Sequence, residues 1–168
     1  DRIESRGLGD VYKRQDDIAY NNHDIQDGIN ANLFKLEELV EIDFFKSIYL
    51  KYKNKINKKN YKIATYQIIR DSIDIMIRDL LTNTQKNLKN LKIKTINDIA
   101  KSDQLIVCFS NKIQNSEIEI KSFLRSRMYN NKLVLRKNQR GKFIIKKLFA
   151  IIKSNPRKFL TKDQLTKD

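Results

Sequence analysis

The sequence predicts an all-α protein, because apolar residues recur at helical spacing along the chain and turn-forming residues are scarce. After residue 15, only Gly28, Gly141 and Pro156 punctuate the chain, which is too few for a many-stranded sheet. The 168 residues suffice for one domain with a core, although a portion of a longer protein could have the same length. We therefore expect a series of packed helices.

The overall charge is strongly basic. Lys and Arg number 35 against 20 Asp and Glu, for a formal charge of +15, which favours polyanionic partners such as nucleotides or nucleic acid. A genome rich in A and T would also raise the Lys, Asn and Ile content, so charge alone does not establish binding. There is one cysteine, Cys108, and no apolar stretch near the roughly 18 residues that span a bilayer. We expect a cytoplasmic protein with no membrane partner and with Cys108 as a buried structural thiol.

The first fifteen residues differ in character from the rest. They hold two of the four glycines and show no helical apolar period. Residues 10–15, DVYKRQ, are the translation of GATGTGTATAAGAGACAG, which resembles the end sequence of a transposon used to prepare sequencing libraries. We therefore expect residues 1–15 to be a non-native, adapter-derived segment, with an ordinary polar N-terminal tail as the alternative. Residues 16–168 are then expected to be part of a natural protein, truncated at both ends.

Residues 16–28, DDIAYNNHDIQDG, are expected to form a helix. At about 100° per residue, its polar side chains gather on one third of the circumference and its isoleucines lie opposite. The polar group comprises Asp16, Tyr20, His23, Asp24 and Asp27, and the apolar group comprises Ile18, Ile25 and Ile29. Three carboxylates this close repel one another unless cations or hydrogen-bond donors offset the repulsion. The polar face is therefore either a solvated surface or a site for a metal or a substrate.

The sequence of the middle of the chain predicts two more helices and a basic segment ahead of them. The basic run of residues 51–59 is expected to be a solvated helix end or loop, with a phosphate-binding patch as the alternative. Residues 61–89 have apolar side chains at steps of four, three and four, which predicts a long helix. Those side chains are Ile69, Ile73, Met76 and Leu80. Residues 95–98, TIND, have the form of a helix cap.

Two further helices are predicted toward the C-terminus. Residues 116–119, SEIE, have the capping-box pattern ahead of apolar residues, so a helix should begin there. Residues 143–152 are strongly apolar, with Leu148 and Phe149 spaced for burial. The sequence Ser154-Asn155-Pro156 should end that helix.

The segment of residues 16–28 also resembles a known family. It looks very like the helix of dGTP triphosphohydrolases, and of their bacterial dGTPase-like relatives, that supplies the last metal ligand. The similarity covers essentially all of residues 16–165 in the expected order. The later motifs are Ile69-Arg70, Ile73-Asp74, Met76-Ile77, Asp79, Phe109-Ser110, residues 121–124, residues 128–130, Leu148-Phe149 and Pro156. The chain thus resembles the C-terminal portion of a dNTP triphosphohydrolase of the HD-domain superfamily.

This resemblance implies a multi-helix, partial HD-domain phosphohydrolase fold and an activity. The family hydrolyses deoxynucleoside triphosphates to a deoxynucleoside and tripolyphosphate, using a divalent metal, Mg²⁺ or Mn²⁺, that is held by two histidines and two aspartates. Such a metal polarises phosphoryl oxygens and lowers the pKa of a bound water. Position by position, Asp16 matches the final metal-ligand aspartate, whereas Tyr20 and Asp24 match the residues that face the deoxyribose. The resemblance also implies that the full-length protein forms a homo-oligomer.

The chain departs from the family pattern in its histidines. His23-Asp24 looks like the dipeptide that names the superfamily, but it lies downstream of Asp16 on the same helix, and the chain has no second histidine. Three of the four expected ligands are therefore missing, so we expect residues 1–168 alone to bind the metal poorly and to be inactive. Arg70 could meet a phosphate or form a surface ion pair. Two alternatives stay open: a basic all-helical nucleic-acid-binding module, supported only by the charge, and a metal-free regulatory or assembly piece.

Overall fold

The computed structural model describes residues 4–161, with side chains from residue 9 onward. Every regular element within this range is helical, and none of the described residues is in a β-strand. This confirms the predicted all-α class. Contacts between Cα atoms divide the chain into two compact units, residues 1–128 and residues 129–168, and each is described by itself.

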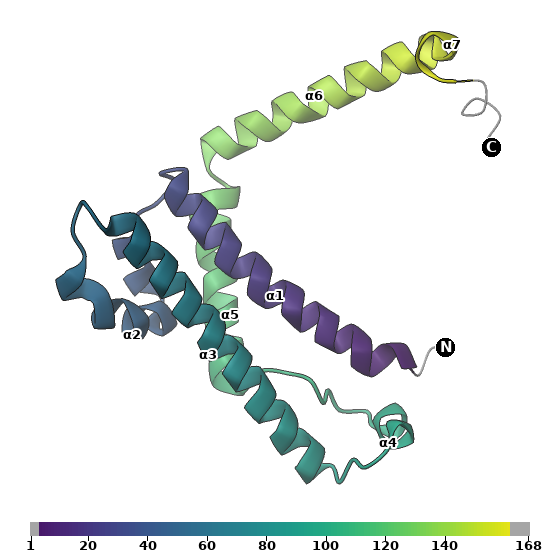
Figure 1. Cartoon of the computed structure of the whole chain (residues 1–168). Coiled ribbons are helices and arrows are strands. Elements are labelled where there is room, and N and C mark those ends of the chain that lie inside the picture. Colours follow the sequence, from purple (N-terminus) through teal and green to yellow (C-terminus); the bar gives the residue numbers. More distant parts are fainter. Residues whose placement is uncertain (1–3, 162–168) are drawn as a thin grey trace. The chain divides into compact units, whose positions relative to one another are not determined.

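The first unit contains five α-helices (Figure 1). They are α1 (Glu4–Asn30), α2 (Asp43–Tyr52), α3 (Tyr61–Asn90), α4 (Ile96–Lys101) and α5 (Asn111–Leu124). The short helical turns η1 (Leu36–Glu41) and η2 (Lys53–Lys55) flank α2, and η3 (Arg125–Tyr129) follows α5. Helix α1 packs mainly against α3 and also contacts α4 and α5, while α2 packs against α3 and α5.

The second unit consists of α6 (Lys132–Ser154) and α7 (Pro156–Phe159). The side chain of Asn131 caps α6 by accepting a hydrogen bond from the amide of Leu133 at 3.0 Å. Pro156 begins α7 directly after α6 ends, as the predicted stop signal requires. Gly141 does not interrupt the helix and lies within it.

The core of the first unit lies where α1, α2, α3 and α5 meet. Ile18, Ile25 and Ile29 of α1 are all buried, which confirms the predicted apolar face of residues 16–28. The largest fully buried apolar side chains are Phe45, Ile25, Leu36, Leu39, Ile48, Ile68, Met76, Ile120 and Leu124. Removal of these surfaces from water is the main stabilising contribution to the unit.

Gly28 lies inside α1 and has a packing role in place of the predicted punctuation. A Cβ atom at this position would overlap the ring of Phe34. Phe34 in turn packs edge-on against Phe123 of α5, with ring centroids 5.0 Å apart at 82°. The missing side chain therefore allows the residues after α1 to fold back onto the core.

The predicted extent of α3 and the predicted cap of α4 are confirmed. Helix α3 extends over Tyr61–Asn90, within one residue of the range expected from its apolar spacing. Thr95 caps α4, and the side chain of Asp98 accepts a reciprocal bond from the Thr95 amide at 2.8 Å. The basic run of residues 51–59 forms the end of α2 and the connection to α3, and most of its side chains are exposed.

The predicted start of α5 at residues 116–119 is wrong. The helix begins at Asn111 and its cap is Ser110, whose hydroxyl accepts from the Ile113 amide at 3.5 Å. Asp79 of α3 fixes this serine by accepting from its amide at 2.8 Å and from its hydroxyl at 2.6 Å. Ser116 lies within the helix, where its hydroxyl donates to the carbonyl of Lys112 at 3.1 Å.

Two predictions of burial are also corrected. Leu148 and Phe149 of α6 are 52% and 67% exposed, and α6 has no buried residue. Cys108 is only partly buried. Its sulfur lies 3.3 Å from the side-chain nitrogen of Asn87 and 3.6 Å from that of Asn83, so two donors of α3 hold it at the surface of the core.

Candidate functional site

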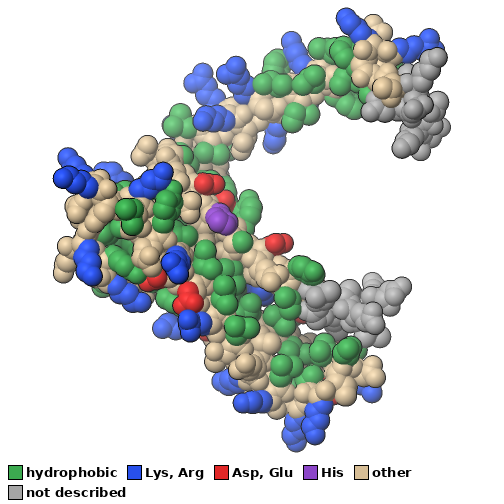
Figure 2. Space-filling view, viewed as in Figure 1, with side chains coloured by type: hydrophobic (Ala, Val, Ile, Leu, Met, Phe, Trp, Pro, Cys, Tyr) green, Lys and Arg blue, Asp and Glu red, His purple; other side chains and the backbone are tan. Residues whose placement is uncertain are grey.

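The polar face of α1 lines a groove of about 680 Å³, which we call the acidic groove. Asp16, Asp17, Tyr20, Asn21, His23 and Asp24 line it from α1, and Lys121 lines it from α5. Figure 2 shows the single histidine side chain at the surface with acidic side chains near it. The face therefore adjoins a concave surface.

The structure brings together the three residues singled out from the sequence. Asp16, Tyr20 and Asp24 are spaced by four residues, so they follow one another along the same side of α1, and all three line the acidic groove. Tyr20 is 63% exposed, which leaves its ring accessible to a ligand. Asp27 was grouped with them on the helical wheel but does not line the groove.

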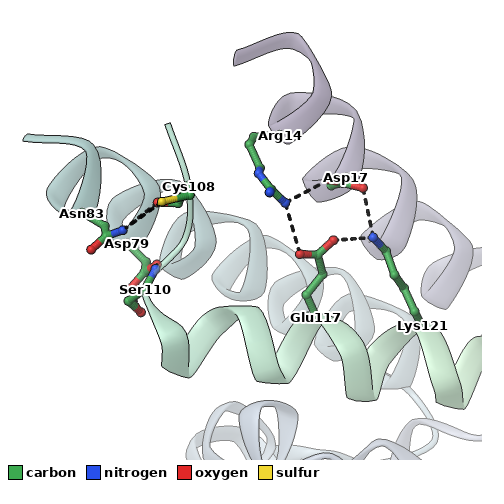
Figure 3. Close-up of polar contacts among 8 residues, drawn as sticks. All are labelled: Arg14, Asp17, Asp79, Asn83, Cys108, Ser110, Glu117 and Lys121. Carbon is green, nitrogen blue, oxygen red and sulfur yellow. Dashed lines mark hydrogen bonds and ion pairs between the residues drawn. The ribbon is translucent and has the colours of Figure 1, made fainter. Parts of the chain in front are cut away.

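A charged cluster joins α1 to α5 beside the groove (Figure 3). Arg14 donates to Asp17 at 3.3 Å and to Glu117 at 3.5 Å, and its guanidinium lies over the ring of Phe109. The ammonium of Lys121 donates to Asp17 at 3.1 Å and also to Glu117. The Glu117 side chain is only 6% exposed, so these contacts compensate a carboxylate that has lost nearly all its water.

Lys121 is held in its charged form at this cluster. Burial opposes the charge, but hydrogen bonds to Glu117 and Asp17 outweigh it and raise the pKa of the ammonium above its usual value. Sequence reasoning did not find the cluster, because its contacts join residues as far apart as Asp17 and Lys121, which are separated by 104 residues along the chain. No local spacing signals a contact of that kind.

Asn21 and Asn22 are neighbouring buried amides with different surroundings. The Asn22 nitrogen donates to the carbonyl of Ile18 at 2.8 Å and lies 3.5 Å from the sulfur of Met76. Asn21 is only 2% exposed, and its side-chain nitrogen has no hydrogen-bond partner within the described residues. Leaving a buried donor unsatisfied costs about 1–3 kcal/mol. Asn21 also lines the acidic groove.

Carboxylate oxygens, which Mg²⁺ and Mn²⁺ prefer as ligands, line the acidic groove at Asp16, Asp17 and Asp24. The Asp16 carboxylate is exposed and forms no ion pair with another described residue. Asp17, in contrast, is occupied by Arg14 and Lys121. Within residues 4–161, no three His, Cys, Asp or Glu side chains are grouped closely enough to hold a metal ion. Asp16 therefore fits the role of one ligand of a divalent metal, and the described residues do not complete the coordination shell.

Other polar contacts near the site hold the helices together. Figure 3 shows Asp79 bonded to Ser110, and Asn83 beside Cys108. The Asn83 nitrogen also donates to the Cys108 carbonyl at 2.9 Å. Arg70 is exposed on α3 and does not line the acidic groove.

Comparison with known proteins shows which proteins the chain is similar to. A model described as a phosphohydrolase-associated domain matches residues 107–167. A deoxyguanosinetriphosphate triphosphohydrolase-like protein of Pelagibacter ubique is 60% identical over 153 residues, which make up 91% of this chain and 41% of that protein. The chain is a relative of the dGTP triphosphohydrolase-like proteins. The resemblance inferred from residues 16–165 is thereby confirmed.

More distant dGTP triphosphohydrolase-like proteins match a similar portion. The one from Leptospira interrogans is 33% identical over 153 residues, covering 89% of this chain and 40% of that protein. The one from Bartonella tribocorum is 33% identical over 141 residues, covering 84% and 35%. The chain thus spans about two fifths of the length of these dGTP triphosphohydrolase-like relatives. The matches support a hydrolase family and do not favour the nucleic-acid-binding module.

Proposed function

We propose that this dGTP triphosphohydrolase-like chain forms part of a metal-dependent hydrolase that cleaves deoxynucleoside triphosphates to a deoxynucleoside and tripolyphosphate. The observation that carries the proposal is the acidic groove. Asp16, Tyr20 and Asp24 line it together with Asn21, whose side-chain nitrogen has no hydrogen-bond partner among the described residues. The relatives' names, which describe dGTP triphosphohydrolase-like proteins, support the same reaction class.

Asp16 is proposed to hold the divalent metal, Mg²⁺ or Mn²⁺, through its carboxylate. A divalent metal at this position supplies a polarised phosphoryl oxygen and an activated water. Asp17 is proposed to have a structural role instead, because its carboxylate is paired with Lys121 of α5. The remaining metal ligands are proposed to come from the part of the longer protein that this chain does not span.

Tyr20 and Asp24 are proposed to bind the sugar. The accessible Tyr20 ring can pack against a deoxyribose, and the Asp24 carboxylate, one turn further along α1, can accept a hydrogen bond from its 3′-hydroxyl. A ring packed against the 2′ carbon disfavours a ribose by crowding its extra hydroxyl. Discrimination against ribonucleotides would then depend on Tyr20 in particular.

Asn21 is proposed to donate to an oxygen of the same substrate. Its amide nitrogen is buried and unpartnered, so a substrate oxygen would gain a hydrogen bond without displacing an internal one. Lys121 of α5 also lines the groove as a cation, and it offsets part of the repulsion that the acidic residues exert on an anionic substrate. We also propose that the full-length protein is cytoplasmic, as its single cysteine suggests. The family resemblance further implies that it assembles as a homo-oligomer.

The proposal is tested by grafting this chain in place of the matched region of the Pelagibacter ubique relative and measuring dGTP hydrolysis. Asp16→Asn should lower kcat by more than about 100-fold, since even an outer partner of a metal ligand costs 10–100-fold. Asp27→Asn is the matched control, because Asp27 is on the same helix but outside the groove. Unchanged hydrolysis in the Asp16 variant would remove this residue from the metal site.

A second readout needs no turnover. The chain has one histidine, His23, which lines the acidic groove, so its imidazole gives a single set of NMR signals. Titrating Mn²⁺ into the chain should broaden these signals through the unpaired electrons of the ion. The broadening should require higher Mn²⁺ concentrations in Asp16→Asn than in Asp27→Asn. Equal broadening in both variants would contradict a role for Asp16 in metal binding.

A further inference from the structure

The second unit carries most of the net positive charge of the chain. Residues 129–168 contain twelve of the 35 Lys and Arg but only two of the 20 Asp and Glu, so they account for ten of the fifteen net charges. No acidic residue lies within α6 or α7. Figure 2 shows apolar and basic side chains along α6. Without counter-charges of its own, this unit favours an anionic partner.

The apolar residues in the C-terminal half of α6 form one face. At about 100° per residue they fall within an arc of about 160° of the helix circumference. Five of the six are exposed and the sixth is half-buried. They are Ile144, Ile145, Leu148, Phe149, Ile151 and Ile152. A contiguous exposed apolar surface of this kind indicates a binding site.

The basic residues of α6 lie on the opposite face. Seven of its eight Lys and Arg fall within the opposite arc of about 160°, and only Lys137 lies on the apolar side. Phe143 is also on the basic side, where the ammonium of Lys147 lies 5.1 Å from the centroid of its ring. Phe, Leu and Ile on one face with Lys and Arg on the other are typical of a helix that lies in the plane of a membrane surface.

We infer that α6 binds the surface of an anionic membrane, with its apolar face among the acyl chains and its basic face at the headgroups. Both faces contribute, because apolar burial and attraction to anionic lipids add to the strength of binding. The expected absence of a membrane partner rested on the lack of a spanning stretch, and none of the described helices is long and apolar enough to cross a membrane. A helix that lies on the surface does not need that length. The inference does not depend on the proposed hydrolysis.

Two other occupants match only one face of α6. A nucleic acid would pair with the basic face but would leave the apolar face in water. A second copy of α6 would cover the apolar face, but it would bring two sets of cations together without counter-charges. An anionic membrane surface matches both faces.

The contribution of the apolar face is tested by sedimenting the chain with vesicles of phosphatidylcholine and phosphatidylglycerol in equal parts. The double variant Leu148→Gln, Phe149→Gln should lower the partition coefficient at least about tenfold, since it removes two apolar anchors without changing the charge. The matched control is Ile63→Gln, Ile118→Gln, which alters two exposed apolar residues outside α6 and should leave binding unchanged. Because α6 has no buried residue, both variants should fold, as circular dichroism will verify.

The contribution of the basic face is tested with the same vesicles at low salt. Lys146→Gln, Lys147→Gln should weaken binding about tenfold, because both cations would lie near the headgroups. The control Lys58→Gln, Lys59→Gln removes two adjacent exposed lysines from the connection between α2 and α3 and should have an effect below about twofold. Vesicles of phosphatidylcholine alone should bind the unmodified chain at least about tenfold more weakly.

The remaining outcomes decide between the occupants. Equal binding of the unmodified chain and the Leu148→Gln, Phe149→Gln variant would overturn the inference. Displacement of the chain from vesicles by an oligonucleotide whose binding is unaffected by that variant would also overturn it, as would dimerisation of the chain that the variant abolishes. The graft into the Pelagibacter ubique relative should bind the same vesicles, and a folded graft that does not bind would assign the apolar face to the longer protein. If the graft does not fold, the intact Pelagibacter ubique protein takes its place. Hydrolysis of dGTP by the graft tests only the proposed function, so the two failures are distinguishable.

Discussion

Helices α1 and α6 are both amphipathic, yet they differ in what becomes of their apolar sides. In α1, Ile18, Ile25 and Ile29 are buried against the other helices of the first unit, and the opposite side lines the acidic groove. In α6 no residue is buried, and Ile145 and Phe149 are more than 65% exposed. The comparison teaches that apolar periodicity predicts which side of a helix can be buried, whereas burial itself requires a partner surface.

The largest expected difference between the two helices is in their tolerance of a charge. Ile25→Asp would place an unpaired carboxylate where the native side chain is 0% exposed. We expect it to lower the free energy of unfolding by about 4 kcal/mol or more. Ile145→Asp, at a position that is 68% exposed in α6, should change it by no more than about 0.5 kcal/mol. Urea denaturation followed by circular dichroism measures the free energy of unfolding of both variants. Similar losses in Ile25→Asp and Ile145→Asp would contradict the expected difference between the two helices.

The charged cluster gives the next largest effect, because it ties α1 to α5. Glu117→Gln removes the carboxylate that both Arg14 and Lys121 contact. We expect a loss of about 2 kcal/mol, because two charge-assisted hydrogen bonds are weakened while Arg14 and Lys121 keep Asp17 as a partner. Glu119→Gln, an exposed position on the same helix, is the control and should be nearly neutral. A neutral result for Glu117→Gln in the same urea experiment would show that the cluster adds nothing to the packing of α1.

A smaller effect of opposite sign is expected on the polar side of α1. Asn21→Leu replaces a buried amide whose nitrogen is unsatisfied with an apolar group of similar size. We expect the chain to gain about 1 kcal/mol in stability, measured as a higher melting temperature. The same change in the graft should raise the KM for dGTP. A destabilised Asn21→Leu variant would indicate that the amide already has a partner in the native chain.

The smallest effect is local and concerns α4, which like α6 has no buried residue. Hydrogen bonds from the amides of Lys94 and Thr95 lower the pKa of Asp98 below its ordinary value of 3.8. A lowered pKa in the folded state means that the cap stabilises α4 above pH 3.8 and is lost as the pH falls through the folded value. Amide protection in α4, measured as the hydrogen-exchange rate relative to that of an unstructured peptide at the same pH, should therefore fall below pH 3.8, and in Asp98→Ala it should be low at every pH. Unchanged protection in that variant would contradict the role of the cap.

The parts of the fold that local sequence determines were predictable. The length of α3 follows from apolar spacing, and the cap of α4 follows from Thr95 and Asp98. The start of α5 was mispredicted because two serines compete for it. Ser110 is the cap, since Asp79 fixes it across 31 residues of sequence, and no pattern within α5 carries that information.

The candidate site likewise contains residues that local sequence predicts and residues that only tertiary packing brings in. Asp16, Tyr20 and Asp24 could be placed together because a four-residue spacing on one helix is a local property. Lys121 and Glu117 could not, since they reach α1 only through the tertiary packing of α5. The exposure of Leu148 and Phe149 was equally beyond prediction, because their spacing describes a capacity for burial and says nothing about the surface that would cover them.

The close approach of Phe34 to Gly28 makes this position intolerant of variation. The ring occupies the space of any β-carbon at residue 28 and is itself held edge-on by Phe123. A library that randomises this codon and is selected for folded protein should return glycine almost exclusively. Asp27, the neighbouring residue, is exposed, so its position should tolerate most amino acids under the same selection.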